Sequence, residues 1–247
     1  MKRWRNIRDV DMKLVAVIGA AGFVGSQIAE AIKADSRYSL LPVYRNSRYP
    51  EQLIDLVDII IHTANPAKRL NAEKKPELDF TETVEKTAKI LSMAKGKRFI
   101  LISSLSCRNQ LYSSYGRNRR ACELMVLPGN SLIIRLGPMF GGNRKKDLIH
   151  DLLASKELHI AETTRYAYVD VKWVGKQIVS MLEEENGICE IGAYNSICLK
   201  DLRDFFDSTS VFSGIEEHQE PKDFLDGPNV HDVYNYMKHE MEAMVKR

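Results

Sequence analysis

The chain has 247 residues, of which 44% are hydrophobic, 28% charged and 8% aromatic, and its 36 lysines and arginines against 33 aspartates and glutamates give a formal net charge of +3. This length and composition suit a folded domain with a substantial core, and they exclude a disordered chain and a disulfide scaffold. So small a basic excess gives no support to nucleic-acid binding, because proteins that track phosphates concentrate much more positive charge.

The sequence also indicates neither membrane insertion nor secretion. Its longest apolar runs, such as residues 14–18, fall far short of the roughly 20 residues that a membrane-spanning helix needs. The basic N-terminal residues are followed by no apolar segment of the kind that a secretory signal contains. No histidine has a second ligand at metal-site spacing, so we expect no metal site. Four scattered cysteines without a C-x-x-C pair indicate reduced thiols in a soluble, cytoplasmic protein; they are Cys107, Cys122, Cys189 and Cys198.

Apolar runs alternate with amphipathic stretches along the first half of the chain. Residues 1–11 are basic and show little periodicity, which predicts a flexible leader, and Met12 could serve as the natural start. Amphipathic, helix-like stretches occupy residues 78–94 and 119–127. The predicted strands lie at residues 14–18, 40–44, 58–62, 99–102 and 132–134. Strands alternating with helices predict an α/β protein with a Rossmann-like, doubly wound parallel sheet.

One irregularity concerns the third strand of such a sheet. Only residues 45–57 separate the second predicted strand from the next one, which leaves room for a helix and not for a further strand as well. Pro42 lies inside the second strand, and a proline is tolerated in a strand mainly at the edge of a sheet. We therefore expect the third strand to be lost or vestigial and the second strand to form the edge.

The pattern loosens after Gly141. We expect helices over residues 147–155 and 171–184, from Lys200 and from His231, a short strand over 166–169, and a strand pair over 188–191 and 197–199. The resulting prediction is a dinucleotide-binding domain formed by residues 12–142 and 166–186. A small, discontinuous substrate-binding part would comprise residues 143–165 and 187–247.

Three glycines follow the first predicted strand with the spacing G-x-x-G-x-x-G. Gly19 would permit a tight turn, Gly22 a close approach of backbone to phosphate, and Gly25 close packing of the following helix on the strand. The N-terminus of that helix would attract a pyrophosphate through its free amides and its dipole. This pattern predicts a dinucleotide-binding turn, with an ordinary glycine-rich turn as the alternative.

Further segments follow in an order that is typical of one family. They are Ile18–Gly25, His62–Asn65, Phe99–Ser104, Tyr115–Arg119 with Glu123, Ile134–Gly141 and Tyr168–Val171. On these segments the chain resembles the extended short-chain dehydrogenases/reductases, the NAD(P)-dependent nucleotide-sugar epimerase/dehydratase family. The resemblance extends from residue 14 to about residue 185, and the last part of the chain matches only loosely.

The resemblance implies a catalytic set of Ser104, Tyr115 and Arg119. Tyr115 would exchange a proton with a substrate oxygen, and Ser104 would hydrogen-bond the same oxygen, whereas Ser103 would be structural. The family has lysine where this chain has Arg119, a permanent cation that can lower the pKa of the tyrosine and cannot release a proton into a relay. Two interpretations remain open: an active enzyme with a modified relay, and a non-catalytic dinucleotide-binding sensor or scaffold with a degenerate active site.

The end of the second strand indicates which cofactor is bound. NAD enzymes place an acidic residue there, and this chain has Arg45 and Arg48 with no acid before Glu51, which favours NADP and leaves NAD possible. The residues expected to bind the cofactor are Gly19, Ala21, Gly22, Phe23, Val24, Gly25, Arg45, Arg48, Thr63, Ala64, Asn65, Tyr115 and Arg119.

The substrate implied by the resemblance is a small molecule, a keto-sugar attached to a nucleotide. Dehydratases of the family carry an Asp-Glu pair after the catalytic serine, and this chain has Leu105-Ser106, which favours a reductase or an epimerase. Pro138 stands where the family often has asparagine, so contacts to the substrate must differ. The residues expected to face the substrate are Ser104, Ser106, Pro138, Met139 and Arg165.

Two surface features complete the expectations. The basic run Arg144–Lys146 could bind a diphosphate, and a solvated charge run is the favoured interpretation. The resemblance also implies a homodimer through helices over residues 78–94 and 114–127, although burial of their apolar residues in the chain's own core would explain the pattern equally well.

Overall fold

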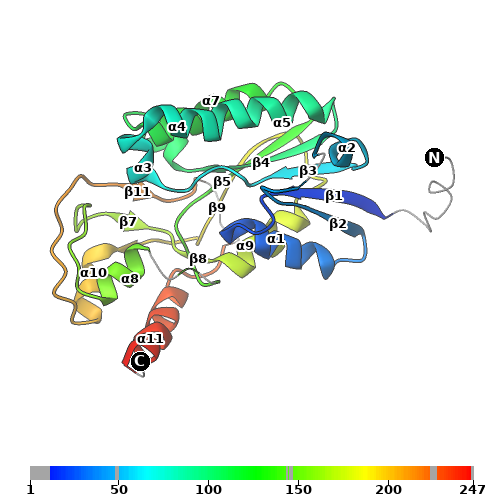
Figure 1. Ribbon diagram of the computed structural model, residues 1–247. Helices are drawn as coiled ribbons and strands as arrows, with labels where there is room; N and C mark the ends of the chain where they lie inside the picture. The colour runs from blue at the N-terminus through cyan, green and yellow to red at the C-terminus, as the bar shows by residue number, and fades with distance from the viewer. Residues whose placement is uncertain (1–11, 48–49, 143, 145–146, 223–226, 246–247) are drawn as a thin grey trace.

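Six parallel strands form the central sheet of the described part of the chain, which comprises residues 12–47, 50–142, 144, 147–222 and 227–245 of a computed structural model (Figure 1). The strands follow the order β2–β1–β3–β4–β5–β9. Their bounds are β1 Lys13–Ile18, β2 Tyr38–Val43, β3 Ile59–His62, β4 Arg98–Ser104, β5 Ser131–Leu136 and β9 Gly187–Ile191. The predicted Rossmann-like parallel sheet is confirmed. The expected leader, residues 1–11, lies outside the described residues.

Strand β2 is the edge of this sheet, as Pro42 predicted. Pro42 lies opposite Val17 in the parallel pairing of β2 with β1, and its missing N–H removes no bond on the outer side of an edge strand. The chain continues through α2 (Pro50–Asp55) to β3, which pairs with the other side of β1. Within the described residues no strand lies beyond β2, so the loss of the third strand is confirmed.

Helices cover both faces of the sheet (Figure 1). They are α1 Phe23–Lys33 and α9 Val171–Ser180 on one face, and α5 Lys86–Ala94 and α7 Ser114–Val126 on the other. Alternate residues of each strand enter opposite cores: Val17 and Ile61 pack in the α1–α9 core, whereas Ile18 and Ile60 pack in the core beneath α5 and α7. Burial on both faces explains why these strands read as continuous apolar runs.

The amphipathic stretch 78–94 forms three successive helical segments. They are α4 Pro76–Phe80, a π-helical turn Thr81–Glu85, and α5. On the two helices expected to form a dimer contact, Leu78 is 56%, Phe80 45% and Leu124 55% exposed. Ala121 and Met125 of α7, in contrast, pack against the chain's own core, so core burial explains part of the apolar pattern of this helix.

The strand pair expected over 188–191 and 197–199 does not form. Residues 187–191 are β9 and pair with β5, where Glu190 lies opposite Arg135 and accepts a hydrogen bond from its guanidinium (Nη1 to Oε1, 3.1 Å). Arg135, Glu190 and Ile191 are all buried, as expected for a strand that joins the sheet beside β5. The expected domain division at residue 187 is therefore wrong, because β9 belongs to the central sheet.

A smaller part lies beside the carboxyl ends of the central strands (Figure 1). Its three-stranded sheet has the order β10–β7–β11. Tyr166 of β7 therefore belongs to this part, and not to the dinucleotide-binding domain as expected. The three strands of this sheet are β7 Arg165–Tyr166, β10 Ile197–Cys198 and β11 His218–Gln219, and β6 Met139–Phe140 pairs with β8 Val169–Asp170 in a separate two-stranded sheet. The helices not yet given are α3 Arg69–Lys74, α6 Ser106–Asn109, α8 Leu148–Leu153, α10 Leu199–Phe205 and α11 Asp232–Val245. None of the helices in the described ranges has the length and apolarity to cross a membrane.

Helices α1 and α9 meet backbone to backbone at Gly175, which gives a test of this packing. A Cβ at Gly175 would lie 2.7 Å from the carbonyl carbon and oxygen of Gln27. In an open helix, glycine to alanine stabilises by about 1 kcal/mol; here we expect Gly175→Ala to destabilise the protein by about 1–3 kcal/mol through overpacking. Denaturant unfolding measures the change, with Lys176→Ala as the exposed control on the same helix. A higher unfolding midpoint for Gly175→Ala would contradict this packing.

Candidate active site

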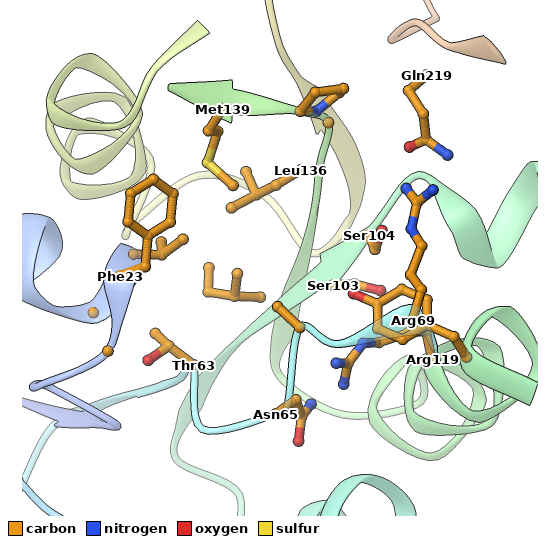
Figure 2. A pocket seen from close by; sticks show the side chains of 18 of the residues that line it. Phe23, Thr63, Asn65, Arg69, Ser103, Ser104, Arg119, Leu136, Met139 and Gln219 are labelled. Atoms are coloured by element: carbon orange, nitrogen blue, oxygen red, sulfur yellow. The ribbon is translucent and has the colours of Figure 1, made fainter. Parts of the chain in front are cut away.

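A cavity of about 390 Å³ lies at the carboxyl ends of β1, β3, β4 and β5 (Figure 2). Ligand sites of parallel α/β sheets form at this edge, because the loops that leave the strands diverge there. The cavity is lined by Gly22, Phe23, Val24, Gly25, Thr63, Asn65, Ala67, Arg69, Ile102, Ser103, Ser104, Tyr115, Arg119, Leu136, Gly137, Pro138, Met139, Arg144, Tyr166 and Gln219.

The glycine turn forms one side of the cavity. Gly19 has φ +93°, a conformation that favours glycine, and a Cβ on Gly25 would lie 2.1 Å from the carbonyl oxygen of Gly19. Thr63 braces the turn by donating to the carbonyl oxygen of Ile18 at 3.0 Å. Gly22 is the N-cap of α1 and supplies no capping side chain. The first amides of α1 therefore remain available to an anion.

Phe23 and Arg144 lie together beside this turn. The guanidinium carbon of Arg144 lies 3.9 Å from the centroid of the Phe23 ring, a cation–π contact. Arg144 thus lines the cavity at the helix N-terminus, which corrects the favoured interpretation of this residue as part of a solvated charge run. Residues 145 and 146 of that run lie outside the described residues.

Helix α7 places Tyr115 at the opposite side of the cavity. Ser113 caps the helix by accepting from the amide of Gly116 at 2.9 Å, and the Glu73 carboxylate of α3 accepts from the amide of Ser114 at 2.7 Å. A Cβ on Gly116 would lie 2.1 Å from the carbonyl oxygen of Gln110. The glycine after Tyr115 is therefore required by the close approach of the α6–α7 connection.

Arg119 lies against the ring of Tyr115. Its guanidinium carbon is 4.7 Å from the ring centroid, and its Nη2 donates to the carbonyl oxygen of Pro66. Arg119 is 3% exposed, and its Nη1 has no hydrogen-bond partner within the protein. The arginine thus holds the loop after β3 with one nitrogen and presents another to the cavity.

The charges around Tyr115 lower its pKa. Burial by itself raises the pKa of this phenol, and the positive charge and hydrogen bond of Arg119, the charge of Arg69 and a hydrogen bond with Ser104 together bring it below the ordinary value of 10. In the described chain, the other tyrosines with a resolved shift, such as Tyr166 and Tyr168, have raised pKa values because burial disfavours their phenolates. Tyr115 is thus singled out by its surroundings.

The two serines at the end of β4 have different partners. Ser103 donates to the buried carboxylate of Glu123 at 2.7 Å, whereas Ser104 donates to the hydroxyl of Ser106 at 3.2 Å. Ser106 is fully buried and does not line the cavity. Ser106 therefore does not reach the cavity as expected, and its hydroxyl contacts the hydroxyl of Ser104 instead.

Several expected site residues lie away from the cavity lining. Arg165 is exposed and donates to the hydroxyl of Ser196 at 3.0 Å, which removes it from the expected substrate contacts in this arrangement. Arg45 is exposed. The hydrogen bond and charge of Lys86 lower the pKa of Glu82, and the charge of Arg45 adds a smaller contribution. Gly19, Ala21 and Ala64 belong to the turn and loop behind the lining. Arg48 lies outside the described residues.

Besides Tyr166, sequence reasoning missed two further polar residues of the cavity, Arg69 and Gln219. Arg69 enters it from α3 and Gln219 from β11, and both lie on the side of Ser104 and Arg119 in Figure 2. Arg69 forms an ion pair with Glu217, and its guanidinium carbon lies 5.9 Å from the Tyr115 ring centroid. Neither residue belongs to a motif, so only their spatial convergence on Tyr115 could have identified them.

The site contains groups that fit a dinucleotide. Both amide atoms of Asn65 and Nη1 of Arg119 are buried without a hydrogen-bond partner in the protein, a state that normally requires a ligand or water. A Cβ at Gly19 or Gly25 would lie within 3 Å of neighbouring atoms, so the chain can approach closely at these positions only as glycine, which suits a backbone cradle for phosphate. Among the described residues, no group of three or more His, Cys, Asp or Glu side chains could hold a metal ion.

Comparisons with known proteins agree with this fold. No family profile matches the chain. It is 24% identical to the ceramide reductase of Caulobacter vibrioides, over 81% of this chain and 69% of that protein. The UDP-N-acetylglucosamine 4-epimerase of Methanobrevibacter ruminantium superposes with a TM-score of 0.77 at 15% identity, covering 96% of this chain and 99% of the epimerase. The dTDP-4-dehydrorhamnose reductase of Bacillus anthracis, in complex with NADP, superposes with a TM-score of 0.77 at 14% identity, covering 93% and 99%. The chain therefore has the fold of these enzymes.

The pKa of Tyr115 can be measured directly. We expect ultraviolet difference titration to show one tyrosine that ionises below the ordinary value of 10. This ionisation should be absent from Tyr115→Phe and should move to higher pH in Arg119→Met, because loss of a neighbouring positive charge disfavours the phenolate. Arg117→Met, on the exposed side of the same helix, is the control and should leave it in place. An identical titration in Arg119→Met and wild type would contradict the described electrostatics.

Proposed function

We propose that this protein is an NADP(H)-dependent oxidoreductase or epimerase of the extended short-chain dehydrogenase/reductase type that acts on a carbonyl or hydroxyl group. The observation that carries the proposal is Tyr115, a buried phenol with a lowered pKa, next to Ser104 and across one cavity from the glycine turn. A proton donor and acceptor beside a dinucleotide cradle is the arrangement that such chemistry needs.

The dinucleotide would be held by the chain's own groups along the cavity. The first amides of α1 would bind its pyrophosphate, with Arg144 adjacent, and Asn65 and Arg119 would satisfy their unpartnered atoms on its ribose and nicotinamide portion. When bound, the nicotinamide supplies or accepts a hydride. The two catalytic side chains do not perform that transfer; they position the substrate oxygen and move its proton.

Tyr115 would donate its proton to the substrate oxygen during reduction and accept it during oxidation. Ser104 would turn its single hydroxyl hydrogen from Ser106 to the same oxygen, and the amide of Ser106, which donates to Ser104 Oγ at 3.2 Å, holds the hydroxyl at the end of β4. A phenol with an ordinary pKa near 10 is a poor base near neutral pH. The positive charges of Arg119 and Arg69 bring the phenol closer to the working range.

The first candidate substrate is a keto-sugar attached to a nucleotide. Its support is the fold shared with the UDP-N-acetylglucosamine 4-epimerase and the dTDP-4-dehydrorhamnose reductase. The second candidate is the carbonyl group of a lipid. Its support is the sequence likeness to a ceramide reductase and an apolar wall formed by Leu136, Pro138 and Met139 in the same cavity (Figure 2).

The assignment of the acid/base predicts the behaviour of Tyr115→Phe. This variant should lose about 100- to 10,000-fold in turnover, because it lacks the proton that a positioned general acid supplies, and should bind NADPH almost as wild type does. NADPH oxidation assays with carbonyl substrates and fluorescence titration of the cofactor measure the two effects. A Tyr115→Phe variant as active as the wild type would refute the site.

Variants of Arg119 distinguish an active enzyme from a non-catalytic sensor or scaffold. We expect Arg119→Met to weaken NADPH binding and slow turnover together, because Arg119 contacts the Tyr115 ring and presents a free donor to the cavity. Arg119→Lys should retain or raise activity, since it keeps the cation and adds a group that can release a proton. An inactive wild type whose Arg119→Lys variant gains turnover would identify a degenerate member with an intact pocket.

The cofactor preference is a further expectation. Arg45 follows the end of β2 and is exposed, and an arginine there suits the 2′-phosphate of NADPH. We expect tighter binding of NADPH than of NADH, and Arg45→Asp should reverse the order of the two affinities. Fluorescence titration of both cofactors tests this, with the exposed Lys172→Asp as a charge-matched control on α9. Equal affinities in the wild type would contradict the assignment.

A further inference from the structure

Gln219 reaches the cavity from the smaller part of the molecule with an unused hydrogen-bond acceptor. The residue is 1% exposed, its Nε2 lies 3.5 Å from the hydroxyl of Ser106, and its Oε1 has no partner in the protein. Ser106 in turn contacts Ser104. The amide is therefore one hydroxyl away from the serine beside Tyr115, and its buried oxygen calls for a donor.

Arg69 lines the same cavity as Gln219, and Figure 2 shows both side chains on the side of the cavity where Ser104 lies. The guanidinium of Arg69 has five N–H donors, of which the ion pair with Glu217 and a hydrogen bond with Tyr166 use only part. A guanidinium cannot act as an acceptor. The pair therefore presents surplus donors from Arg69 and one free acceptor from Gln219, next to the position of the reacting oxygen.

We propose that Gln219 and Arg69 recognise a secondary amide next to the reacting carbonyl, so that the substrate is an N-acylamino ketone or the corresponding alcohol. The amide N–H would donate to Oε1 of Gln219, and the acyl oxygen would accept from Arg69. This inference rests on the proposed function and narrows its substrate class. It commits to a group that either candidate substrate can carry, an N-acyl group on a sugar or on a lipid.

The donor and acceptor count favours an amide over a carboxylate, a phosphate or an ester. A carboxylate or phosphate would satisfy Arg69 but offers no donor to Gln219 and would place a negative charge against its free oxygen. An ester supplies the acyl oxygen and lacks the N–H. A secondary amide supplies one donor and one acceptor in a fixed planar arrangement, which matches what the two side chains present.

Matched ketones test this recognition. The probes are 3-acetamido-2-butanone and 3-acetoxy-2-butanone, which differ only in N–H against O, and the corresponding pair with dodecanoyl in place of acetyl. NADPH oxidation gives kcat/KM for each. We expect the wild type to prefer the amide of a pair about 5- to 150-fold, the ratio that corresponds to leaving one buried acceptor unpaired. A preference confined to the acetyl pair indicates a sugar-like source, and one confined to the dodecanoyl pair a lipid.

Variants assign the preference to its residue. Gln219→Leu should bring the amide-to-ester ratio close to one, and Gln219→Glu should retain a ratio above one because a carboxylate oxygen still accepts from N–H. Arg69→Met should lower kcat/KM for both members of a pair, since both carry the acyl oxygen. Gln177→Leu, on the half-buried side of α9 and remote from the cavity, is the control and should change nothing.

The outcomes separate this inference from the proposed function. A wild type that reduces both members of each pair with equal kcat/KM would overturn the recognition of an amide and leave the oxidoreductase proposal standing. A parallel loss for amide and ester in Gln219→Leu would also overturn it, because the residue would then act only through Ser106. If protein that binds NADPH reduces none of the four ketones, the proposed reduction of carbonyls and this inference fail together.

Discussion

The site depends on a buried carboxylate. Glu123, fully buried on α7, accepts hydrogen bonds from Ser103 of β4 at 2.7 Å, from the Cys107 thiol at 2.8 Å, and from the Arg135 guanidinium of β5 at 2.9 and 2.7 Å. Burial raises the pKa of Glu123, but these hydrogen bonds and the positive charge of Arg135 outweigh burial, so its pKa is lowered. For Cys107, burial and the neighbouring Glu123 carboxylate raise the pKa to about 12. A buried charge left without its partner costs about 3–5 kcal/mol, so this contact holds the Tyr115 helix in one position on the strands.

The same charge network continues toward the smaller part of the molecule. Arg135 also donates to Glu190 of β9 at 3.1 Å, and Arg108 of α6 lies 2.9 Å from the same carboxylate. Arg108 donates to the carbonyl oxygen of Glu220 at 2.7 Å, directly after β11. The network thus connects the Tyr115 helix to the strand that carries Gln219. The groups proposed for catalysis and for substrate recognition are therefore connected by ion pairs and by one hydrogen bond to the backbone.

Arg119 stands where the family that the sequence resembles has lysine. Its guanidinium reaches the carbonyl oxygen of Pro66 in the loop after β3, and its Nη1 is buried without a hydrogen-bond partner in the protein. A lysine ammonium is a compact point charge, whereas the planar fork of arginine can bind in two directions at once. Arg119 therefore combines a contact that holds the loop with an open donor, and Arg69 adds a second cation on the other side of the Tyr115 ring.

The sequence by itself determined those features that depend only on residues close together in the chain. Continuous apolar runs predicted the buried strands, Pro42 predicted the edge strand, and the glycine spacing and Tyr115–Arg119 segment predicted where the cradle and the phenol lie, because backbone freedom and helix periodicity are short-range properties. The tertiary structure alone decided that β9 joins the central sheet, since that position depends on the distant Arg135–Glu190 pair. It also decided that Arg69 and Gln219 line one cavity with Tyr115, because residues far apart in the sequence come together only after the chain has folded.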